Sequence, residues 1–401
     1  MIKFNYIGNN ETKGIDYDWN RIKNEYRKLK CPPGIFDPCT APIEKNSYLF
    51  YLSIRSVGKT TGWLLMGMIM HELYGTTVCY VRETEEQTAP KYTRELLNVI
   101  LDYEQGRYIR DITKGAYNGI VIDTRRLYYV LRDDNGKEIV RSAEPFLVML
   151  SLDLWTEYKS TMNFPRGDLF IFDEFIGKYY REDSFINFMQ ILSTIGRRRH
   201  SLRIVMLANN AKYTSPWYRE FMIQNIVRHL EVGEKASMVT PKGTPIYIEF
   251  VEPKLKKDVI EHGNIYFGFD NPGIAAITGT DVVWAFPEVP RIRVEEDDVL
   301  ITKQIRIRAE EDLKLSIWSN SEIGVHVRIY PTTSPVHADE IVLTLDTPKN
   351  RQELFALGAG DLFRSIWNIY KKDLFFFSDN ETGAVFDDYF QRAKEALRKR
   401  S

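Results

Sequence analysis

The stretch Ser53–Thr60 (SIRSVGKT) has the residue types of a phosphate-binding loop. It lies between an apolar, β-favouring run, Tyr48–Ile54, and a helix-like stretch, Thr60–Tyr74, which is the setting that such a loop requires. The backbone N–H groups of a tight turn next to a helix N-terminus bind phosphate oxygens. We therefore expect Lys59 to reach the β- and γ-phosphates of ATP and the Thr60 hydroxyl to ligate Mg²⁺.

The usual loop pattern begins with glycine, and Ser53 stands in that place. The sequence therefore does not fix the angle at which the chain enters the loop. A Gly-Lys-Thr triplet after a strand also occurs by chance, and the prediction therefore needs support from other residues. The residues expected to line the nucleotide are Ser53, Arg55, Ser56, Val57, Gly58, Lys59, Thr60 and Thr61.

A pair of acidic residues, Asp173 and Glu174, directly follows the apolar run Leu169–Phe172. Carboxylates at the end of a buried strand lie at the ligand-binding edge of an open α/β sheet. We expect Asp173 to hold Mg²⁺ and Glu174 to orient and polarise the attacking water. Strands often end in solvated acids, but the order of this pair after the loop favours an ATP site.

Two further features follow downstream. Asn209 ends the next apolar run, Arg203–Leu207, where a polar side chain can sense the γ-phosphate; an ordinary Asn-rich turn is the alternative. The cluster Arg197-Arg198-Arg199-His200 follows a predicted helix, Ser184–Ile195. Such a cluster is usually a favourable partner of the helix dipole on a solvated surface, but in a ring-shaped ATPase it can project an arginine into the neighbouring subunit's site.

The elements that must position these residues alternate between strands and helices, which predicts a mainly parallel α/β sheet. Strands are expected at Thr77–Arg82 and Phe146–Leu150 in addition to those above, and a helix at Pro90–Leu101. A hairpin insertion is expected, with Ile120–Leu131 paired to Glu138–Arg141 across Asp133–Gly136.

We divide the chain into residues 1–252, 253–297 and 298–401. The first part is the P-loop (ASCE-type) ATPase domain, with a proline-rich extension up to about residue 45 wrapped onto it, and the second is a linker or lid. The third has three strands in a row and then helix, strand and helix, which looks like a ribonuclease H-type fold. The expected elements are Leu313–Trp318, Gly324–Tyr330, Ile341–Leu345, Arg351–Tyr370, Leu374–Phe377 and Ala384–Lys399.

The composition excludes several classes of protein. The chain has 401 residues, with 54 Lys+Arg against 55 Asp+Glu, a net charge of −1 and 27% charged residues. A disordered chain, a collagen-like chain and a uniformly cationic surface are thereby excluded. Three cysteines without a pairing pattern favour a reducing compartment. We expect no secretory leader in the polar N-terminus and no membrane span, since the apolar run Trp63–Met70 is too short.

The sequence resembles the DNA-packaging (encapsidation) ATPases of small tailed phages of the phi29-like type, distant relatives of large terminase subunits. The resemblance covers about residues 48–226 best. It is carried by the arginine-bearing loop Ser53–Thr60, Tyr80-Val81-Arg82, Leu150–Ser160 (LSLDLWTEYKS), Ile171–Ile176 (IFDEFI) and Thr194–Arg203 leading to Asn209. It implies that Lys59 and Thr60 are nucleotide and Mg²⁺ ligands, that Glu174 is catalytic and that Arg197 is the trans-acting finger. Lys159 matches a lysine near the subunit boundary.

The resemblance also implies partners and a place of action. A pentameric ring would act in the host cytoplasm, transiently at the portal vertex of a procapsid, and would not stay in the mature virion. It would drive double-stranded DNA inward; whether a structural RNA takes part is open. The family's C-terminal domain is a nuclease relative without its metal acids, and Leu313–Trp318 indeed lacks the carboxylate that a two-metal nuclease needs on its first strand. Surface positions explain the remaining acids, Asp346, Asp361, Asp387 and Asp388.

DNA contact is expected on basic loops, and solvated charge is the simpler explanation for each candidate. The candidates are Lys254, Lys256, Lys257, Arg125 and Arg126. Other functions stay open at this point: a helicase or another ring ATPase, a terminase with an active nuclease, and a portal-associated protein with a decayed nucleotide site.

Overall fold

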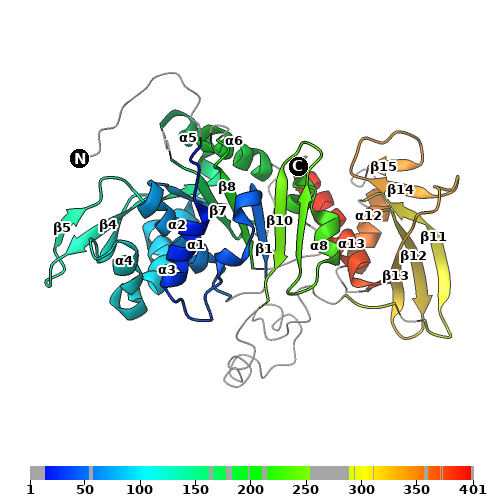
Figure 1. The fold of residues 1–401 in the computed structure, drawn as a ribbon. Coiled ribbons are helices and arrows are strands. Elements are labelled where there is room, and N and C mark those ends of the chain that lie inside the picture. The colour runs from blue at the N-terminus through cyan, green and yellow to red at the C-terminus, as the bar shows by residue number, and fades with distance from the viewer. Residues whose placement is uncertain are drawn as a thin grey trace.

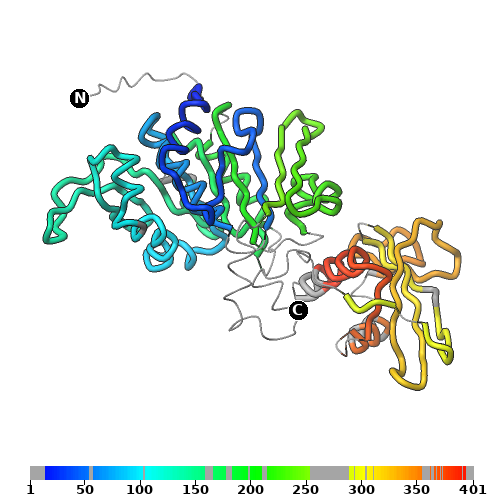
Figure 2. The backbone as a smooth tube through the Cα atoms, turned by 60° about the horizontal axis from the view of Figure 1, so that its bottom comes forward, coloured from blue at the N-terminus to red at the C-terminus, as the bar shows by residue number. Residues whose placement is uncertain are grey.

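The computed structural model describes residues 14–53, 57–161, 166–177, 183–196, 199–209, 215–252, 289–292, 294–309, 311–355, 360–370, 372 and 374–398. They form two bodies, a larger one up to residue 252 and a C-terminal one from residue 289, as Figures 1 and 2 show. Among these residues no helix combines the length and apolar character that crossing a bilayer requires.

The larger body is built on a 10-stranded sheet in the order β3-β4-β6-β2-β7-β8-β1-β10-β9, with β5 paired to β4. The neighbours from β6 to β10 are parallel, and β9, β4, β3 and β5 are added in antiparallel pairs. The mainly parallel sheet is therefore confirmed. The strands are β1 Tyr48–Leu52, β2 Val78–Arg82, β3 Gly119–Asp123, β4 Arg126–Arg132, β5 Glu138–Arg141, β6 Leu147–Ser151, β7 Leu169–Asp173, β8 Arg203–Ala208, β9 Lys235–Val239 and β10 Pro245–Phe250.

Helices cover both faces of this sheet, which explains why its central strands are apolar throughout. On β1, Leu49 and Tyr51 belong to the core shared with α1–α4, while Phe50 and Leu52 belong to the core shared with α5–α8. The helices are α1 Trp19–Lys28, α2 Lys59–Tyr74, α3 Pro90–Asp102, α4 Arg107–Ile112, α5 Trp155–Thr161, α6 Ser184–Gly196, α7 Pro216–Glu220 and α8 Gln224–His229, with short 3-10 turns at Pro38–Thr40, Ile43–Lys45, Glu86–Thr88, Tyr103–Gln105 and Leu152–Leu154.

The predicted hairpin differs from the observed one. The run Ile120–Leu131 is not one strand: it turns at Thr124, where φ is 55°, and forms the antiparallel pair β3 and β4. The turn before β5 is where it was predicted, with Gly136 at φ 79°. Because β4 also pairs with β6, this meander extends the main sheet. It is not a separate insertion.

The segment before β1 packs against α2, as expected of a wrapped extension, and it contains a helix that the sequence analysis did not predict. Asp18 caps α1 by accepting the Arg21 N–H at 3.0 Å, and Ile22 and Tyr26 enter the same core as α2. The chain then passes so close to α2 that a Cβ on Gly62 would lie 2.2 Å from the Phe36 carbonyl oxygen.

The C-terminal body is a 6-stranded sheet in the order β15-β14-β11-β12-β13-β16, with α12 and α13 over one face. The strands β11, β12 and β13 are antiparallel, and β14 and β15 are parallel to β11. The elements are β11 Val299–Ile307, β12 Leu313–Asn320, β13 Gly324–Pro331, β14 Ile341–Thr344, β15 Glu353–Phe355, α12 Gly360–Tyr370, β16 Phe375–Phe377 and α13 Asn380–Arg398.

Two predictions about this body were wrong. Its first strand is β11, ahead of Leu313–Trp318, and β11 (VLITKQIRI) carries no carboxylate either. The stretch predicted as one helix from Arg351 to Tyr370 begins with β15, because pairing with β14 outweighs local helix propensity there. The ribonuclease H-like assignment stays a prediction.

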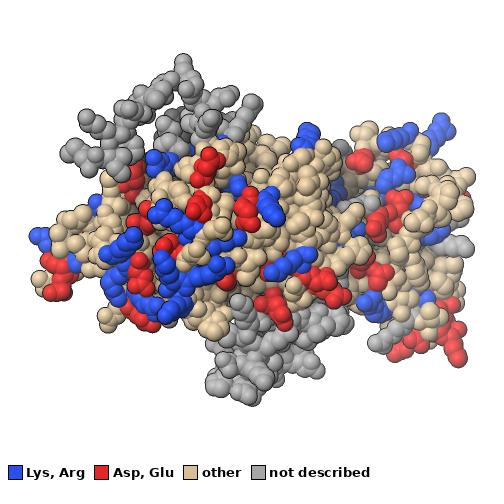
Figure 3. Space-filling model, viewed as in Figure 1, with Lys and Arg blue, Asp and Glu red and all other residues tan. Residues whose placement is uncertain are grey.

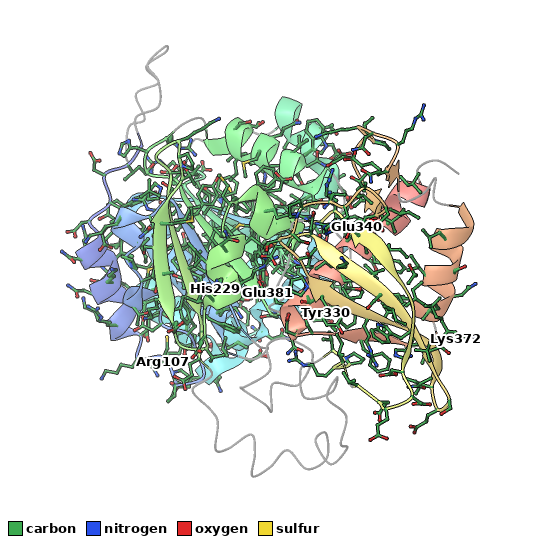
Figure 4. The ribbon with its side chains drawn as sticks, turned by 90° about the vertical axis from the view of Figure 1, so that its right-hand side faces the viewer. Arg107, His229, Tyr330, Glu340, Lys372 and Glu381 are labelled. Carbon is green, nitrogen blue, oxygen red and sulfur yellow. The ribbon has the colours of Figure 1, made fainter. Side chains whose placement is uncertain are left out.

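Ion pairs join the two bodies. Arg228 on α8, whose side chain is 3% exposed, lies 3.0 Å from Glu311 and 3.4 Å from Glu381 of α13. Arg219 on α7 lies 2.7 Å from Asp388, also on α13. Figure 4 looks at this junction from the C-terminal side, with Glu381 labelled beside His229, the last residue of α8.

The predicted linker lies mostly outside the described residues. Where the chain is described again, Val289 donates its N–H to Asn380 at 3.2 Å and Ile292 donates to the Phe377 carbonyl at 3.1 Å. Residues 289–292 therefore pack with the C-terminal body.

Candidate nucleotide-binding site

Three neighbouring parallel strands bring the predicted site residues to one edge of the sheet. β8 lies between β1 and β7, and the register pairs Leu52 with Ala208 and Leu207 with Asp173. Ser53 and Asn209, the next residues along β1 and β8, therefore follow strand ends that lie beside Asp173. This is the edge at which open α/β sheets bind ligands. The additional strand between the loop strand and the acid-bearing strand agrees with the predicted ASCE type.

The loop enters α2 through a left-handed residue. Gly58 has φ 66° and ψ 20°, and α2 begins at Lys59. A side chain on Gly58 would meet the Gly34 carbonyl oxygen at 2.3 Å, so glycine is required by both conformation and space. Val57 is buried and Thr61 is half-buried in the first turn of α2. Arg55 and Ser56 lie outside the described residues.

Lys59 is held at the centre of this edge. Its Nζ donates to the Ser53 hydroxyl and, at 2.9 Å, to Asn209 Oδ1. Its side chain is 3% exposed, and burial lowers the pKa of Lys59 to about 8, against the opposite effect of Asp173 and Glu174. The serine in place of the usual glycine thus supplies an oxygen that accepts a hydrogen bond from the ammonium group.

The two oxygens of the Asp173 carboxylate have different surroundings. Oδ2 accepts from the Thr60 hydroxyl at 2.9 Å and from the Tyr80 hydroxyl at 2.5 Å, and lies 3.5 Å from an Arg82 nitrogen. Oδ1 is buried and has no hydrogen-bond partner within the described residues. A buried, unpartnered carboxylate oxygen beside a threonine hydroxyl fits Mg²⁺, which prefers oxygen ligands and keeps several waters. Thr60 and Asp173 could hold that ion.

Glu174 leaves the strand in a sharp turn. Its φ is 56°, a left-handed conformation that costs of order 1–3 kcal/mol in a residue other than glycine and is concentrated at functional sites. Phe175, which is buried, fixes the turn by donating its N–H to the Leu207 carbonyl at 3.2 Å. The Glu174 side chain is 40% exposed, so water can reach its carboxylate.

Arg82 pairs with Glu174 at 2.6 Å, and sequence analysis assigned no role to it or to Tyr80. Burial alone would lower the pKa of Arg82, but Tyr80, Asp173 and Glu174 together raise it. Both residues come from the end of β2, which neighbours β7. Two signals were present in the sequence: Tyr80-Val81-Arg82 belongs to the family resemblance, and its two polar side chains lie near the end of a buried strand.

The structure describes only part of the arginine cluster. Arg197 and Arg198 lie outside it. Arg199 is buried, pairs with Asp168 and donates to the Gly167 carbonyl at 2.8 Å. Asp168 also accepts from Ser201 at 2.8 Å and from Tyr17 at 3.0 Å. Arg199 is thus held in the interior of the larger body.

Of the remaining candidates, the structure describes the side chains of Arg125 and Arg126. Arg125 pairs with Glu85 and lies 3.9 Å from Glu157, and Arg126 is exposed on β4. Lys254, Lys256, Lys257 and the Lys159 side chain lie outside the described residues. Figure 3 shows other Lys and Arg side chains over the region of α1 and α4, with Asp and Glu among them; the exposed ones include Arg21, Arg27, Lys28 and Arg110.

No protein-family model and no curated protein sequence matches the chain. A solved structure described as the Phi-28 gp11 DNA packaging motor is similar, with a TM-score of 0.52 and 13% identity, over 90% of this chain and 99% of that one. The bacteriophage Phi-29 viral genome packaging motor assembly gives a TM-score of 0.52 and 16% identity over the same shares. Over 90% of its length the chain therefore has the fold of phage DNA packaging motor proteins.

Proposed function

We propose that the chain is an ATP-hydrolysing motor subunit that moves double-stranded DNA into a viral procapsid. The observation that supports this most directly is the meeting of the loop and the acidic pair: Thr60 contacts Asp173, and Lys59 contacts Asn209, at one sheet edge. The fold shared with phage packaging motors supports the DNA-moving part of the proposal.

The residues would act in hydrolysis as follows. Lys59 leaves Ser53 to bind the β- and γ-phosphates, and Asn209, its other partner, is placed to respond when the γ-phosphate departs. Bound Mg²⁺, held by Thr60 and Asp173, would neutralise charge on the phosphate oxygens. Glu174 accepts a proton from the attacking water while Arg82 holds its carboxylate in place.

Catalysis would be completed by a neighbouring subunit of a ring. Arg197 or Arg198 supplies the trans-acting finger, since Arg199 is used inside the subunit. The ring, pentameric by resemblance, would act in the host cytoplasm at the portal of the procapsid. It would grip the DNA backbone without reading sequence; a structural RNA remains a further candidate partner.

We also propose that the C-terminal body has no nuclease activity. Its first strand, β11, offers no metal-binding acid. Of the four acids named from the sequence, Asp388 is paired with Arg219, Asp346 and Asp387 are exposed, and the Asp361 side chain lies outside the described residues. Cutting of supercoiled plasmid in Mg²⁺ or Mn²⁺, abolished by a C-terminal Asp→Ala change, would contradict this.

The test is ATP hydrolysis by the purified chain, with and without double-stranded DNA, together with protection of DNA from nuclease in procapsids. Lys59→Ala should abolish nucleotide binding, and Glu174→Gln should abolish hydrolysis while retaining binding. Glu95→Gln, an exposed carboxylate on α3, is the matched control. Hydrolysis that survives both Lys59→Ala and Glu174→Gln would refute the proposal, and ATP-driven strand separation would favour a helicase.

Sharing of sites between subunits is tested by mixing. Arg197→Ala subunits lack the finger but keep Glu174, and Glu174→Gln subunits have the reverse defect. Mixed rings should therefore hydrolyse ATP faster than either variant alone. Activity equal to the average of the two variants would show that each site is complete within one subunit.

A further inference from the structure

Tyr80 lies on β2 beside the acid-bearing strand β7, opposite Ile171. It is 1% exposed, and its hydroxyl donates to Asp173 Oδ2 at 2.5 Å. This hydrogen bond ties β2 to the carboxylate that ends β7.

The contacts of Asp173 are distributed unequally between its oxygens. Oδ2 receives Tyr80 and Thr60 and faces Arg82, whereas Oδ1 is buried and receives no hydrogen bond within the described residues. A carboxylate fixed through one oxygen cannot rotate freely, so the other oxygen keeps one direction. Groups that hydrogen-bond a metal ligand in this way orient it and tune its affinity.

We propose that Tyr80 is a positioning residue for the metal ion: it holds the Asp173 carboxylate through Oδ2 so that Oδ1 stays presented to bound Mg²⁺ or its water. This inference rests on the proposed ATPase function. It assigns Tyr80 a part that Thr60 cannot take over, because the Thr60 hydroxyl is itself expected to ligate the ion.

The test uses Tyr80→Phe, which keeps the ring that fills the core and removes only the donor. Binding of a fluorescent ADP analogue is measured by polarisation against free Mg²⁺, and again in EDTA. The half-saturating Mg²⁺ concentration should rise about 10- to 100-fold, whereas metal-free binding should change less than about twofold. Tyr129→Phe is the matched control, since Tyr129 is fully buried on β4 and its hydroxyl makes no hydrogen bond within the described residues.

A second variant checks that the effect passes through Asp173. In an Asp173→Asn background, adding Tyr80→Phe should leave the Mg²⁺ dependence unchanged, because the charge that Tyr80 holds is already gone. Three outcomes would each overturn the inference. Tyr80→Phe could leave the half-saturating Mg²⁺ concentration unchanged, or it could lower nucleotide affinity equally with and without Mg²⁺. The effects of the two substitutions on the Mg²⁺ dependence could also be additive in the double variant. Wild-type protein that binds no nucleotide would overturn the proposed function itself, which separates the two failures.

Discussion

Raising the pH from 7 to 9 should weaken nucleotide binding about tenfold, because the binding lysine loses its proton. Burial lowers the pKa of Lys59 to about 8 in the absence of ligand, even though Asp173 and Glu174 oppose the shift. One pH unit above that value about one lysine in ten is charged, and phosphates bind the charged form. Recovering the proton costs about 1.4 kcal/mol per pH unit, which is the expected loss of binding free energy at pH 9.

The assay is the dissociation constant of a fluorescent ADP analogue at several pH values, at constant free Mg²⁺ and ionic strength. Calorimetry in two buffers of different ionisation enthalpy should show proton uptake on binding above pH 8. Lys59→Arg is the control: a guanidinium stays charged throughout this range, so its affinity, whatever its absolute value, should not depend on pH.

A wild-type dissociation constant that changes less than twofold between pH 7 and 9 would refute the reasoning, and so would an equal fall in Lys59→Arg. The stability of the unliganded protein should respond with the opposite sign. The folded-state pKa of Lys59 lies below its ordinary value of 10.5, so the unfolded chain binds the proton more tightly between about 8 and 10.5. In that window this lysine's contribution to the free energy of unfolding rises with pH.

Three further predictions concern neighbouring residues. Arg82→Gln should lower kcat about 10- to 100-fold in a hydrolysis assay, with a much smaller change in nucleotide affinity, because Glu174 loses the partner that places it. Gly62→Ala should lower the free energy of unfolding by about 1–3 kcal/mol in urea melts, because its methyl group would meet the Phe36 carbonyl; an unchanged melt would contradict this close approach. Asp168→Asn should cost about 3–5 kcal/mol in the same melts, because it leaves a buried guanidinium without its carboxylate; a loss below 1 kcal/mol would contradict it.

The placement of the main site residues could be predicted from sequence because strand ends are visible there. Lys59, Asp173 and Asn209 each follow an apolar run, and parallel strands deliver their ends to one edge of a sheet. Their shared edge follows from that placement, whereas the hydrogen bond between Lys59 and Asn209 is seen only in the structure. The hydrogen bond from Lys59 to the Ser53 hydroxyl was not predicted, because a serine in place of the usual glycine was interpreted only as a departure from the loop pattern.

The parts that sequence analysis missed depend on which elements become neighbours. Tyr80 and Arg82 meet the acidic pair because β2 lies beside β7, and chain order does not give that adjacency. Arg199 looked equivalent to the two arginines before it, and only the fold shows that Asp168 binds it.

The errors in strand boundaries also depend on which strands become neighbours in the fold. The stretch Ile120–Leu131 was read as one strand because its turn carries no glycine or proline, although the polar residues 123–126 interrupt its apolar pattern there. Further on, Glu353–Phe355 becomes a strand only because β14 is available to pair with it.

The close approach of Gly34 and Phe36 to Gly58 and Gly62 has a practical consequence for anyone dissecting the protein. The stretch before β1 packs against the start of α2 in the larger body, so a recombinant fragment started at residue 46 would lose the backbone that flanks the lysine-bearing turn. It would also uncover the part of α2 that Ile22, Tyr26 and Leu29 shield from solvent. Such a truncated protein would be expected to aggregate. Affinity tags or fluorophores are better attached far from the contact between this stretch and α2.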